Sequence, residues 1–599
     1  MEDSMTTITN KRVELLRSFL QEHHLDAFIF PSTDPHQSEY IPEYWKTRTW
    51  ISGFDGSAGT AVVTSNRAAV WTDSRYFLAA EEQLQGTPFI LMKEGLKDTP
   101  SITEWLSQVL PQGASVGIDP TVNAFGTFKK WQNDLQLQNI NLILSEDPAD
   151  LLWPDRPSIS QNPICIQPLE LSGESCTDKI KRIRQQMEAK QCEALLLSAL
   201  DEIAWTLNLR GSDIPCNPVF LSYLIVTTQQ TFLFVHQNKL SPELVAYLQE
   251  HNVIVYNYED ITKQLDKLTA RNIWMDLSRT NCALVEAVPA LCSIVDEASP
   301  VAMMKAIKNE QEIAGFRHCM LRDGIAMVQF LKWLEEEIQV HRITELSLSR
   351  QLTAFRKKQS LYRDISFDTI AAYGPHAAIV HYEPSEDSDI PLQKKGLLLL
   401  DSGAQYQDGT TDLTRTIALG NLTEEEKRDY TLVLKGHIRL SQAIFPEGTT
   451  GTQLDICARY AMWQEGMNYL HGTGHGVGAY LNVHEGPHQI RMNYVPSPIC
   501  AGMTVTDEPG LYKAGRHGIR IENTLLVVPD KETEFGLFLR FESLTLCPID
   551  LTPVVVSLMS DDEILWINQY HMRVYEALAP MLDEAHRIWL KQKTEPISR

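Results

Sequence analysis

Hydrophobic positions in the first 150 residues alternate between helical and strand periods. Residues 13–21 carry an apolar stripe at helical spacing, and residues 26–30 form the continuous apolar run of a buried strand. Two apolar stretches at 61–64 and 68–71 lie on either side of a short polar turn and predict a hairpin. Helical spacing returns at 76–83. This alternation predicts an α/β domain over residues 1–154.

The same order of elements recurs over residues 155–302. An amphipathic helix is predicted at 180–190, a strand at 193–197, and a hairpin from two apolar stretches at 223–227 and 231–235. The spacings in the two copies differ by several residues, so the pattern indicates a duplicated domain topology and not a tandem repeat array. The alternative is that any two α/β domains share this order.

A third segment, residues 303–545, begins with the longest helical tract of the chain, predicted at 303–337. The remaining residues, 546–599, contain apolar positions at helical spacing over 561–592. We expect this C-terminal extension to pack on the third segment or on a second subunit.

Two aspartates in the third segment are expected to lie close together. Four leucines at 397–400 predict a buried strand that ends in Asp401, and the Gly- and Thr-rich stretch after it contains Asp412. A strand followed by a hairpin would bring the two carboxylates side by side at the floor of a sheet. Carboxylates so placed repel each other unless they are protonated or bridged by a cation. Taken alone, both could be ordinary turn residues.

Composition and charge narrow the possible functions. The chain has 599 residues, too many for one hydrophobic core, and a formal charge of -24. The acidic balance argues against nucleic acid and against an anionic membrane surface as partners. The ten cysteines include no CxxC pair, and the N-terminus lacks the apolar core of a signal peptide. These features predict a cytoplasmic protein with reduced thiols.

Four short motifs in the third segment concentrate residues with catalytic or metal-binding chemistry. They are HGTGHGVG at 471–478, NVHEGP at 482–487, TDEPG at 506–510 and GIRIEN at 518–523. The glycines of the first motif would let the backbone approach a ligand closely. In the last motif, strand alternation places Ile519 and Ile521 on one face and Arg520 and Glu522 on the other.

Together with the two aspartates, these motifs supply the ligands for a pair of metal ions. Two aspartates, two glutamates and one histidine would balance two divalent cations, with a bridging hydroxide as the nucleophile. Oxygen-rich ligation with one imidazole suits Mn, Co or Zn. Each motif alone has a structural alternative, such as a tight turn or a solvated ion pair, but the ordered set indicates hydrolysis at two metals.

The sequence resembles the metallopeptidases of the pita-bread fold, most closely the long, three-domain Xaa-Pro aminopeptidases (aminopeptidase P). The resemblance covers nearly the whole chain and includes FDGSAGT at 54–60, TDSRYF at 72–77, NLRGSD at 208–213 and KAIKNE at 305–310. It implies an α/β (α+β) fold with two creatinase-like N-terminal domains, a pita-bread catalytic domain and a C-terminal helical extension. Two positions depart from the family pattern: Ser74 and His376 stand where Gly and Asn are expected.

The resemblance also implies a role for each metal ligand. Asp401 would bind one metal, Asp412 and Glu522 would bridge both, and His475 and Glu508 would complete the second. Glu508 would also shuttle a proton from the bridging water to the leaving nitrogen. This proton is needed because the proline nitrogen must be protonated to leave as a neutral amine.

Four further residues are implied at the substrate. His381 and His484 would flank the metals and donate hydrogen bonds to the substrate carbonyl or the oxyanion, or else orient a ligand carboxylate. Trp463 resembles a substrate-contacting tryptophan, the alternative being a core residue. Arg75 resembles an arginine that reaches a substrate site across a dimer interface, the alternative being a surface salt bridge.

The sequence therefore predicts a metal-dependent aminopeptidase that hydrolyses the N-terminal Xaa-Pro bond of peptides. The family implies two divalent ions, with Mn expected and Zn or Co as alternatives, and a homodimer. A prolidase restricted to Xaa-Pro dipeptides is the first alternative. A binding module with a dead site is the second, and a metal-free amidinohydrolase related to creatinase is the third; both would lack part of the acidic ligand set.

Overall fold

The computed structural model describes residues 5–340 and 342–599. Within these ranges, it contains no helix with the length and hydropathy that crossing a lipid bilayer requires. The chain divides into two compact units. The first consists of Met1–Ile166 and Glu174–Val301, and the second of Gln167–Gly173 and Ala302–Arg599.

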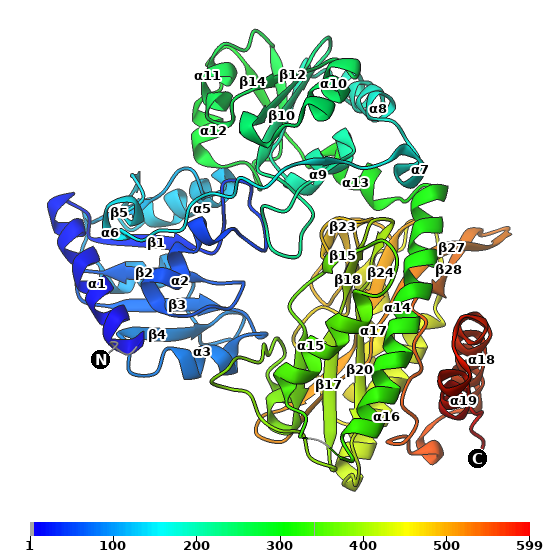
Figure 1. Ribbon diagram of the computed structural model, residues 1–599. Coiled ribbons are helices and arrows are strands. Elements are labelled where there is room, and N and C mark those ends of the chain that lie inside the picture. The colour runs from blue at the N-terminus through cyan, green and yellow to red at the C-terminus, as the bar shows by residue number, and fades with distance from the viewer. Residues whose placement is uncertain (1–4, 341) are drawn as a thin grey trace. The chain divides into compact units, whose positions relative to one another are not determined.

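The first unit contains two six-stranded sheets with the same topology. In each sheet three central strands are antiparallel and the outer strands join in parallel. The first sheet has the order β4 (Phe89–Lys93), β3 (Ala68–Thr72), β2 (Thr60–Thr64), β1 (Ala27–Pro31), β5 (Ser115–Ile118) and β6 (Asn141–Leu144). The second has the order β12 (Val253–Tyr256), β11 (Thr231–Val235), β10 (Ser222–Thr227), β8 (Ala194–Leu197), β13 (Asn272–Met275) and β14 (Ser293–Asp296). The matching orders confirm the duplicated topology (Figure 1).

Each helix predicted in the first unit is present, and two of the three begin earlier than predicted. The helix predicted at 13–21 is longer, α1 (Met5–Glu22), and its apolar stripe is buried at Val13, Leu16 and Leu20. The helix predicted at 180–190 is α8 (Cys176–Ala189), and the Ser175 side chain caps its N-terminus. The expected helix at 76–83 is α3 (Phe77–Gln83).

The second unit is a set of small antiparallel sheets flanked by helices. Its principal helices are α14 (Glu310–Glu337), α15 (Glu345–Arg356), α16 (Glu424–Ser441) and α17 (Gly451–Trp463). Its strands that carry or support the candidate site are β16 (Ile370–Tyr373), β17 (Leu397–Ser402), β20 (Leu413–Ala418), β22 (Gly474–Gly476), β23 (Glu485–Ile490), β24 (Thr504–Asp507), β25 (Gly510–Lys513), β26 (His517–Arg520) and β27 (Asn523–Thr533). The central strand β17 pairs with β16 on one side and β20 on the other.

The tract predicted as one helix at 303–337 is two helices. α13 (Pro300–Ala306) ends before Ile307, and α14 begins after Asn309. The Asn309 side chain accepts hydrogen bonds from the backbone of Gln311 and Glu312, and the Glu312 carboxylate accepts one from the Asn309 backbone. This capping box satisfies the first donors of α14 and fixes its start.

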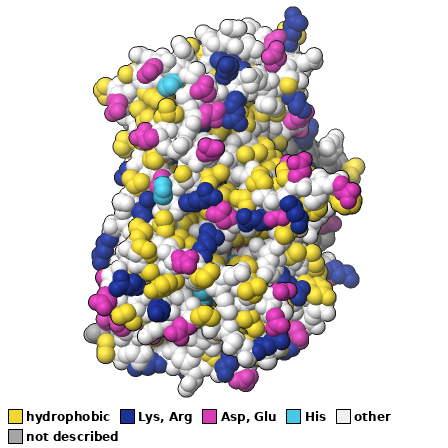
Figure 2. Space-filling model, turned by 90° about the vertical axis from the view of Figure 1, so that its right-hand side faces the viewer, with side chains coloured by type: hydrophobic (Ala, Val, Ile, Leu, Met, Phe, Trp, Pro, Cys, Tyr) yellow, Lys and Arg dark blue, Asp and Glu magenta, His cyan; other side chains and the backbone are white. Residues whose placement is uncertain are grey.

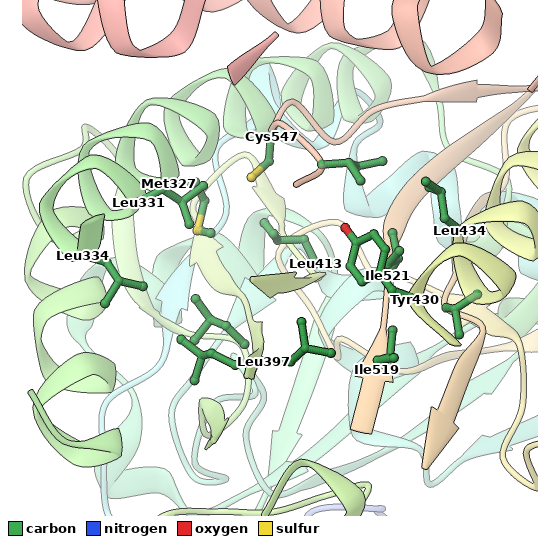
Figure 3. Packing of buried hydrophobic residues seen from close by; sticks show 14 of the residues in the cluster. Met327, Leu331, Leu334, Leu397, Leu413, Tyr430, Leu434, Ile519, Ile521 and Cys547 are labelled. Carbon is green, nitrogen blue, oxygen red and sulfur yellow. The ribbon is translucent and has the colours of Figure 1, made fainter. Parts of the chain in front are cut away.

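A hydrophobic cluster joins α14, the central strands and α16. Figure 3 shows Met327, Leu331 and Leu334 of α14 beside Leu397 of β17 and Leu413 of β20. In the same view, Tyr430 and Leu434 of α16 lie near Ile519 and Ile521. Burial of these side chains against both faces of the strands provides the rigid support on which the candidate site is built.

The C-terminal extension packs on the rest of the second unit, which is one of the two positions expected for it. It is not one helix: α18 (Asp561–Leu578) and α19 (Glu584–Lys593) are separated at Pro580, where proline interrupts helical hydrogen bonding. α18 contacts α14 and α16, and α19 contacts α14. On the face that carries these two helices, acidic, basic and hydrophobic side chains are interspersed (Figure 2).

A buried arginine ties the extension to the strands. Arg415 of β20 donates hydrogen bonds to the carbonyl oxygens of Pro548 at 3.0 Å and Cys547 at 2.8 Å, and to the Tyr570 hydroxyl of α18 at 3.0 Å. It also donates to the backbone oxygen of Glu522 at 2.7 Å. A single guanidinium thus connects α18 to a predicted metal ligand.

We expect the extension to loosen in mild acid because of His571. This buried side chain of α18 accepts a hydrogen bond from the Ile549 backbone at 3.1 Å, and burial, with Arg415 nearby, lowers its pKa to about 4. Between about pH 6.5 and 4, His571 binds a proton in the unfolded chain but not in the folded chain. Its contribution to the free energy of unfolding is therefore fully present above about pH 6.5 and is lost as the pH falls to about 4. The loss should reach about 3 kcal/mol.

Hydrogen exchange of α18, corrected for intrinsic rates, measures this loss. The variant His571→Gln keeps an acceptor but cannot titrate, and should flatten the dependence of the opening free energy on pH. The matched control is His318→Gln, which removes an exposed histidine of α14. An unchanged slope in His571→Gln would refute the assignment to His571.

Candidate metal centre

Antiparallel pairing of β17 and β20 brings the two predicted aspartates together. Asp401 lies near the end of β17 opposite Thr414, and Asp412 immediately precedes β20. Both side chains are buried. Donor atoms of Asp401, Asp412 and Glu522 all lie within 4.8 Å of one another. The sequence prediction that this hairpin places two carboxylates side by side is confirmed.

His475 and Glu508 enter the same site from neighbouring strands. His475 is the middle residue of β22, and its backbone donates to the Thr506 hydroxyl of β24 at 3.1 Å. Glu508 follows β24 directly. The Nε2 atom of His475 lies 3.4 Å from Glu508 Oε1 and 3.5 Å from Asp412 Oδ2. The carbonyl oxygen of Gly476 lies 2.9 Å from His475 Nδ1 and can only accept, so Nδ1 carries a proton. Nε2 is therefore the ring nitrogen that could bind a cation.

Glu522 reaches the site because side chains alternate along its segment. Ile519 and Ile521 are buried in the hydrophobic cluster, while Arg520 and Glu522 point to the acidic residues. The predicted alternation is therefore correct, although β26 ends at Arg520. The Thr414 hydroxyl donates to Glu522 Oε2 at 2.7 Å, which fixes the carboxylate.

The donor atoms form overlapping groups that fit a pair of cations. One group contains Asp401, Asp412 and Glu522, and another contains His475, Glu508 and Glu522. Both have donors within 4.8 Å of one another, and they share Glu522. In addition, Asp401 Oδ1 is buried and has no hydrogen-bond partner among the described residues. A buried carboxylate oxygen without a partner is expected where a cation binds. The donor set fits two oxygen-preferring divalent metals.

Burial and mutual repulsion keep protons on these carboxyl groups. Burial, followed by the charges of neighbouring carboxylates, raises the pKa of Asp412 and of Glu522 well above the ordinary range. Burial raises the pKa of Glu508 to about 7. A shift of this kind is expected where acidic groups share a pocket without enough positive charge.

One arginine offsets part of this charge. Arg520 donates from Nη2 and Nε to the same oxygen of Asp401, Oδ2, at 2.7 and 3.1 Å. Its Nη1 donates to the Tyr512 hydroxyl at 2.7 Å, and that hydroxyl lies 2.8 Å from His471 Nε2. Sequence reasoning placed Arg520 on the polar face but missed its partner, because no local signal pairs it with a residue more than a hundred positions away.

His484 lies against the metal centre. Its ring stands edge-on to that of His475, with centroids 4.4 Å apart, and its donor atom groups with those of Asp412 and His475. His381 belongs to no such group. The next residue, Tyr382, is buried, and its hydroxyl donates to Glu345 at 2.8 Å.

Trp463 and Arg75 lie in different surroundings. Trp463, the last residue of α17, is 40% exposed and donates to Asn468 at 3.0 Å, so it is not a core residue. Arg75, in the first unit, forms a two-bond ion pair with Asp73 at 2.8 and 2.9 Å and contacts Glu39 at 3.4 Å.

Two glycines of the HGTGHGVG motif permit close packing between neighbouring strands. A Cβ at Gly474 would lie 2.0 Å from the Thr506 carbonyl oxygen, and one at Gly476 would lie 2.6 Å from that of Glu485. The close neighbours of these glycines are therefore protein backbone. They permit β22 to pack tightly against β23 and β24, and so help to position His475.

Comparison with known families divides the chain into four matched regions. Residues 12–147 and 155–312 each match a creatinase/prolidase N-terminal domain. Residues 314–529 match metallopeptidase family M24, and 537–597 match the C-terminal region of that family. The M24 region contains all five proposed metal ligands, Asp401, Asp412, His475, Glu508 and Glu522.

Relatives similar to this chain over its whole length share one name. A probable Xaa-Pro aminopeptidase P of Aspergillus niger is 40% identical, covering 99% of this chain and 100% of its own. Another, of Laccaria bicolor, is 41% identical over 99% and 94%. The crystal structure of an X-prolyl aminopeptidase from Caenorhabditis elegans, a cytosolic enzyme with a di-nuclear active site, superposes with a TM-score of 0.95 at 36% identity, covering 98% and 100%. This chain therefore belongs to the Xaa-Pro aminopeptidase P group of metallopeptidase family M24.

Proposed function

We propose that this protein is a metal-dependent aminopeptidase that releases the N-terminal residue from peptides whose second residue is proline. The observation that carries the proposal is the pair of donor groups that share Glu522, which suits two divalent cations held side by side. Full-length relatives named as Xaa-Pro aminopeptidases support the substrate class.

The two donor groups support a division of the ligands. Asp401 would hold one cation and His475 with Glu508 the other, while Asp412 and Glu522 would bridge them. When bound, two divalent cations would supply a nucleophile by lowering the pKa of a water molecule from about 15.7 to about 7. Arg520 and Thr414 would keep Asp401 and Glu522 oriented toward the cations.

Glu508 is proposed to move the proton that the reaction requires. Its carboxylate lies among the proposed ligands, 3.4 Å from His475 Nε2, where the attacking water would be bound. It would accept a proton from the attacking water and donate it to the proline nitrogen, which must be protonated to leave. The Thr506 hydroxyl, 3.2 Å from Glu508 Oε1, fixes the carboxylate for this transfer.

Histidines are proposed to bind the substrate carbonyl. The position of the His484 ring beside His475 supports a role as hydrogen-bond donor to the oxyanion. His381 is proposed for a similar role, supported by the fixed position of Tyr382 next to it. Trp463 and Arg75 remain proposed substrate contacts. The exposed indole of Trp463 could stack on the proline ring. The guanidinium of Arg75 is held in one orientation by Asp73.

Further features of the protein are proposed on the same grounds. Mn is the proposed metal, with Zn or Co as alternatives, because the ligands are mainly oxygens with one imidazole. A homodimer is supported by exposed apolar side chains at Ile456, Tyr460 and Trp463, spaced along one face of α17. A cytoplasmic location is supported by the cytosolic relative of known structure. The boundaries 1–154, 155–302, 303–545 and 546–599 are our proposed domain division.

The alternatives are less well supported. A dead binding module would lack part of the ligand set, whereas all five proposed ligands approach one another here. A prolidase would act on dipeptides, but the relatives that match the full length of the chain are named aminopeptidases.

Substrate length and the position of proline test the choice. We expect Xaa-Pro-Yaa tripeptides to be hydrolysed at least tenfold more efficiently than Xaa-Pro dipeptides. Xaa-Ala-Yaa peptides should be cleaved poorly, because a pocket for proline makes no use of the amide hydrogen that alanine carries. Values of kcat/KM for the three classes provide the comparison. A preference for dipeptides would instead identify a prolidase.

Removal of the metals or of Glu508 should abolish turnover. Chelation should eliminate hydrolysis, and Mn should restore it. Glu508→Gln should lower kcat by about 10²–10⁴-fold, the usual contribution of a general acid–base group. The control Glu534→Gln changes an exposed glutamate of the same unit and should have no effect. Full activity of the metal-stripped protein would contradict a two-metal mechanism.

Metal binding should release protons at neutral pH. In the metal-free protein, burial and neighbouring carboxylates raise the pKa of Asp412 and of Glu522 and so favour their protonated forms, and burial raises the pKa of Glu508 to about 7. Cations must displace the protons that these groups hold. Calorimetric titration with Mn in buffers of different ionisation enthalpy counts the protons released. The number should fall as the pH rises and should be smaller in Glu508→Gln. Binding enthalpies independent of the buffer would show that the ligands are already ionised.

A further inference from the structure

The segment between α13 and α14 contains a buried ion cluster that has no part in the mechanism above. Lys305 lies in the last turn of α13, and Lys308 lies between α13 and α14. The ammonium groups of both lysines bind Glu485. Lys305 Nζ lies 2.6 Å from Glu485 Oε2, and Lys308 Nζ contacts Oε1. All three residues are at most 4% exposed. Lysines and glutamates are rarely buried so completely unless they are paired, as these three residues are.

Glu485 is next to residues of the proposed metal centre in both sequence and space. It follows His484 directly and opens β23, where it pairs with Gly476 of β22. Gly476 in turn follows His475, whose ring contacts that of His484. Contacts that hold Glu485 in place therefore also hold the β22–β23 pair, beside which His475 and His484 lie.

The lysines are themselves immobilised. Lys308 Nζ also donates to the carbonyl oxygens of Lys305 at 3.0 Å and Ala306 at 3.3 Å. The Lys308 backbone donates to the Gly502 carbonyl at 3.0 Å, and Ile307 pairs with Met503, which leads into β24. The cluster thus spans from the start of β24 to the start of β23. A carboxylate held at each oxygen by a different fixed cation has little freedom to rotate.

We propose that Lys305 and Lys308 are positioning residues for the peptidase reaction, which hold the His484 ring against the metal centre by binding both oxygens of Glu485. The proposal rests on the proposed function. It gives a role to the KAIKNE motif at 305–310, which contributes no metal ligand.

The charges around the cluster favour a permanent anchor. His488 of β23 is buried beside it, and its Nε2 contacts the Thr504 carbonyl at 2.7 Å. Burial, and after it the charges of the two lysines, lower the pKa of His488 to about 4. His488 is therefore neutral near pH 7, and Glu485 keeps its two ammonium partners without competition from a third cation.

Lys308→Met, Lys305→Met and Glu485→Gln test the proposal, with Lys531→Met as control because Lys531 is exposed on β27. Nuclear magnetic resonance of the histidine rings, labelled at Cε1, reports the position of His484 in the metal-free and the Zn-loaded protein. The His484 signal is assigned from its loss in His484→Gln. Turnover and Mn content are measured on the same variants.

The His484 signal should move in all three variants and not in the control. It should move more in Lys308→Met than in Lys305→Met, because Lys308 Nζ also donates to the carbonyl oxygens of Lys305 and Ala306. We expect kcat to fall 10- to 100-fold in Lys308→Met while KM changes less than threefold and Mn content remains at the wild-type value. If Lys308→Met does not fold, Lys305→Met and Glu485→Gln provide the same comparison.

An unmoved His484 signal in variants that fold would overturn the proposal, as would wild-type kcat in Lys308→Met. The ring signal does not depend on the substrate. If the wild-type protein failed to cleave Xaa-Pro peptides, the proposed function would fail, whereas the effect of the lysines on His484 would still be measured.

Discussion

Repulsion among four clustered carboxylates, three of them buried, is the constraint on which the catalytic unit depends. Asp401, Asp412, Glu508 and Glu522 come from separate segments, yet their donor atoms lie within overlapping groups less than 5 Å across. Their negative charge far exceeds what Arg520 offsets, so the metal-free pocket must retain protons. The fold thus maintains an arrangement that is unfavourable by itself and becomes favourable when divalent cations bind. Three of the carboxylates, Asp401, Glu508 and Glu522, are held by side chains that are not proposed ligands.

Those partners belong to layers around the pocket. Threonine hydroxyls of Thr414 and Thr506 and the guanidinium of Arg520 contact the ligands directly. Beyond them, the hydrophobic cluster fixes the strands, and Arg415 joins the backbone of Glu522 to the C-terminal extension. The extension is consequently part of the support of the metal centre, although it contributes no ligand.

The sequence predicted the features that depend on local pattern. Leucines before Asp401 indicated a buried strand, alternation of Ile519 and Ile521 with Glu522 indicated which side chains face the site, and repeated element order indicated the duplicated sheets. It did not predict the interruption at Ile307, because the capping box at Asn309 determines where α14 begins. It also did not predict the contact of Arg520 with Asp401, because that pairing depends on tertiary structure. The glycines near His475 were assigned to a ligand, whereas their close contacts are with neighbouring strands.

The central claim is that five side chains hold two cations in one pocket. Anomalous diffraction from crystals grown with Mn, recorded on both sides of its absorption edge, tests this claim most directly. The account predicts two Mn peaks about 3.5–4 Å apart, one beside Asp401 and the other beside His475, with Asp412 and Glu522 between them. A pocket with no Mn peak, or with Mn bound only outside this group of residues, would contradict it.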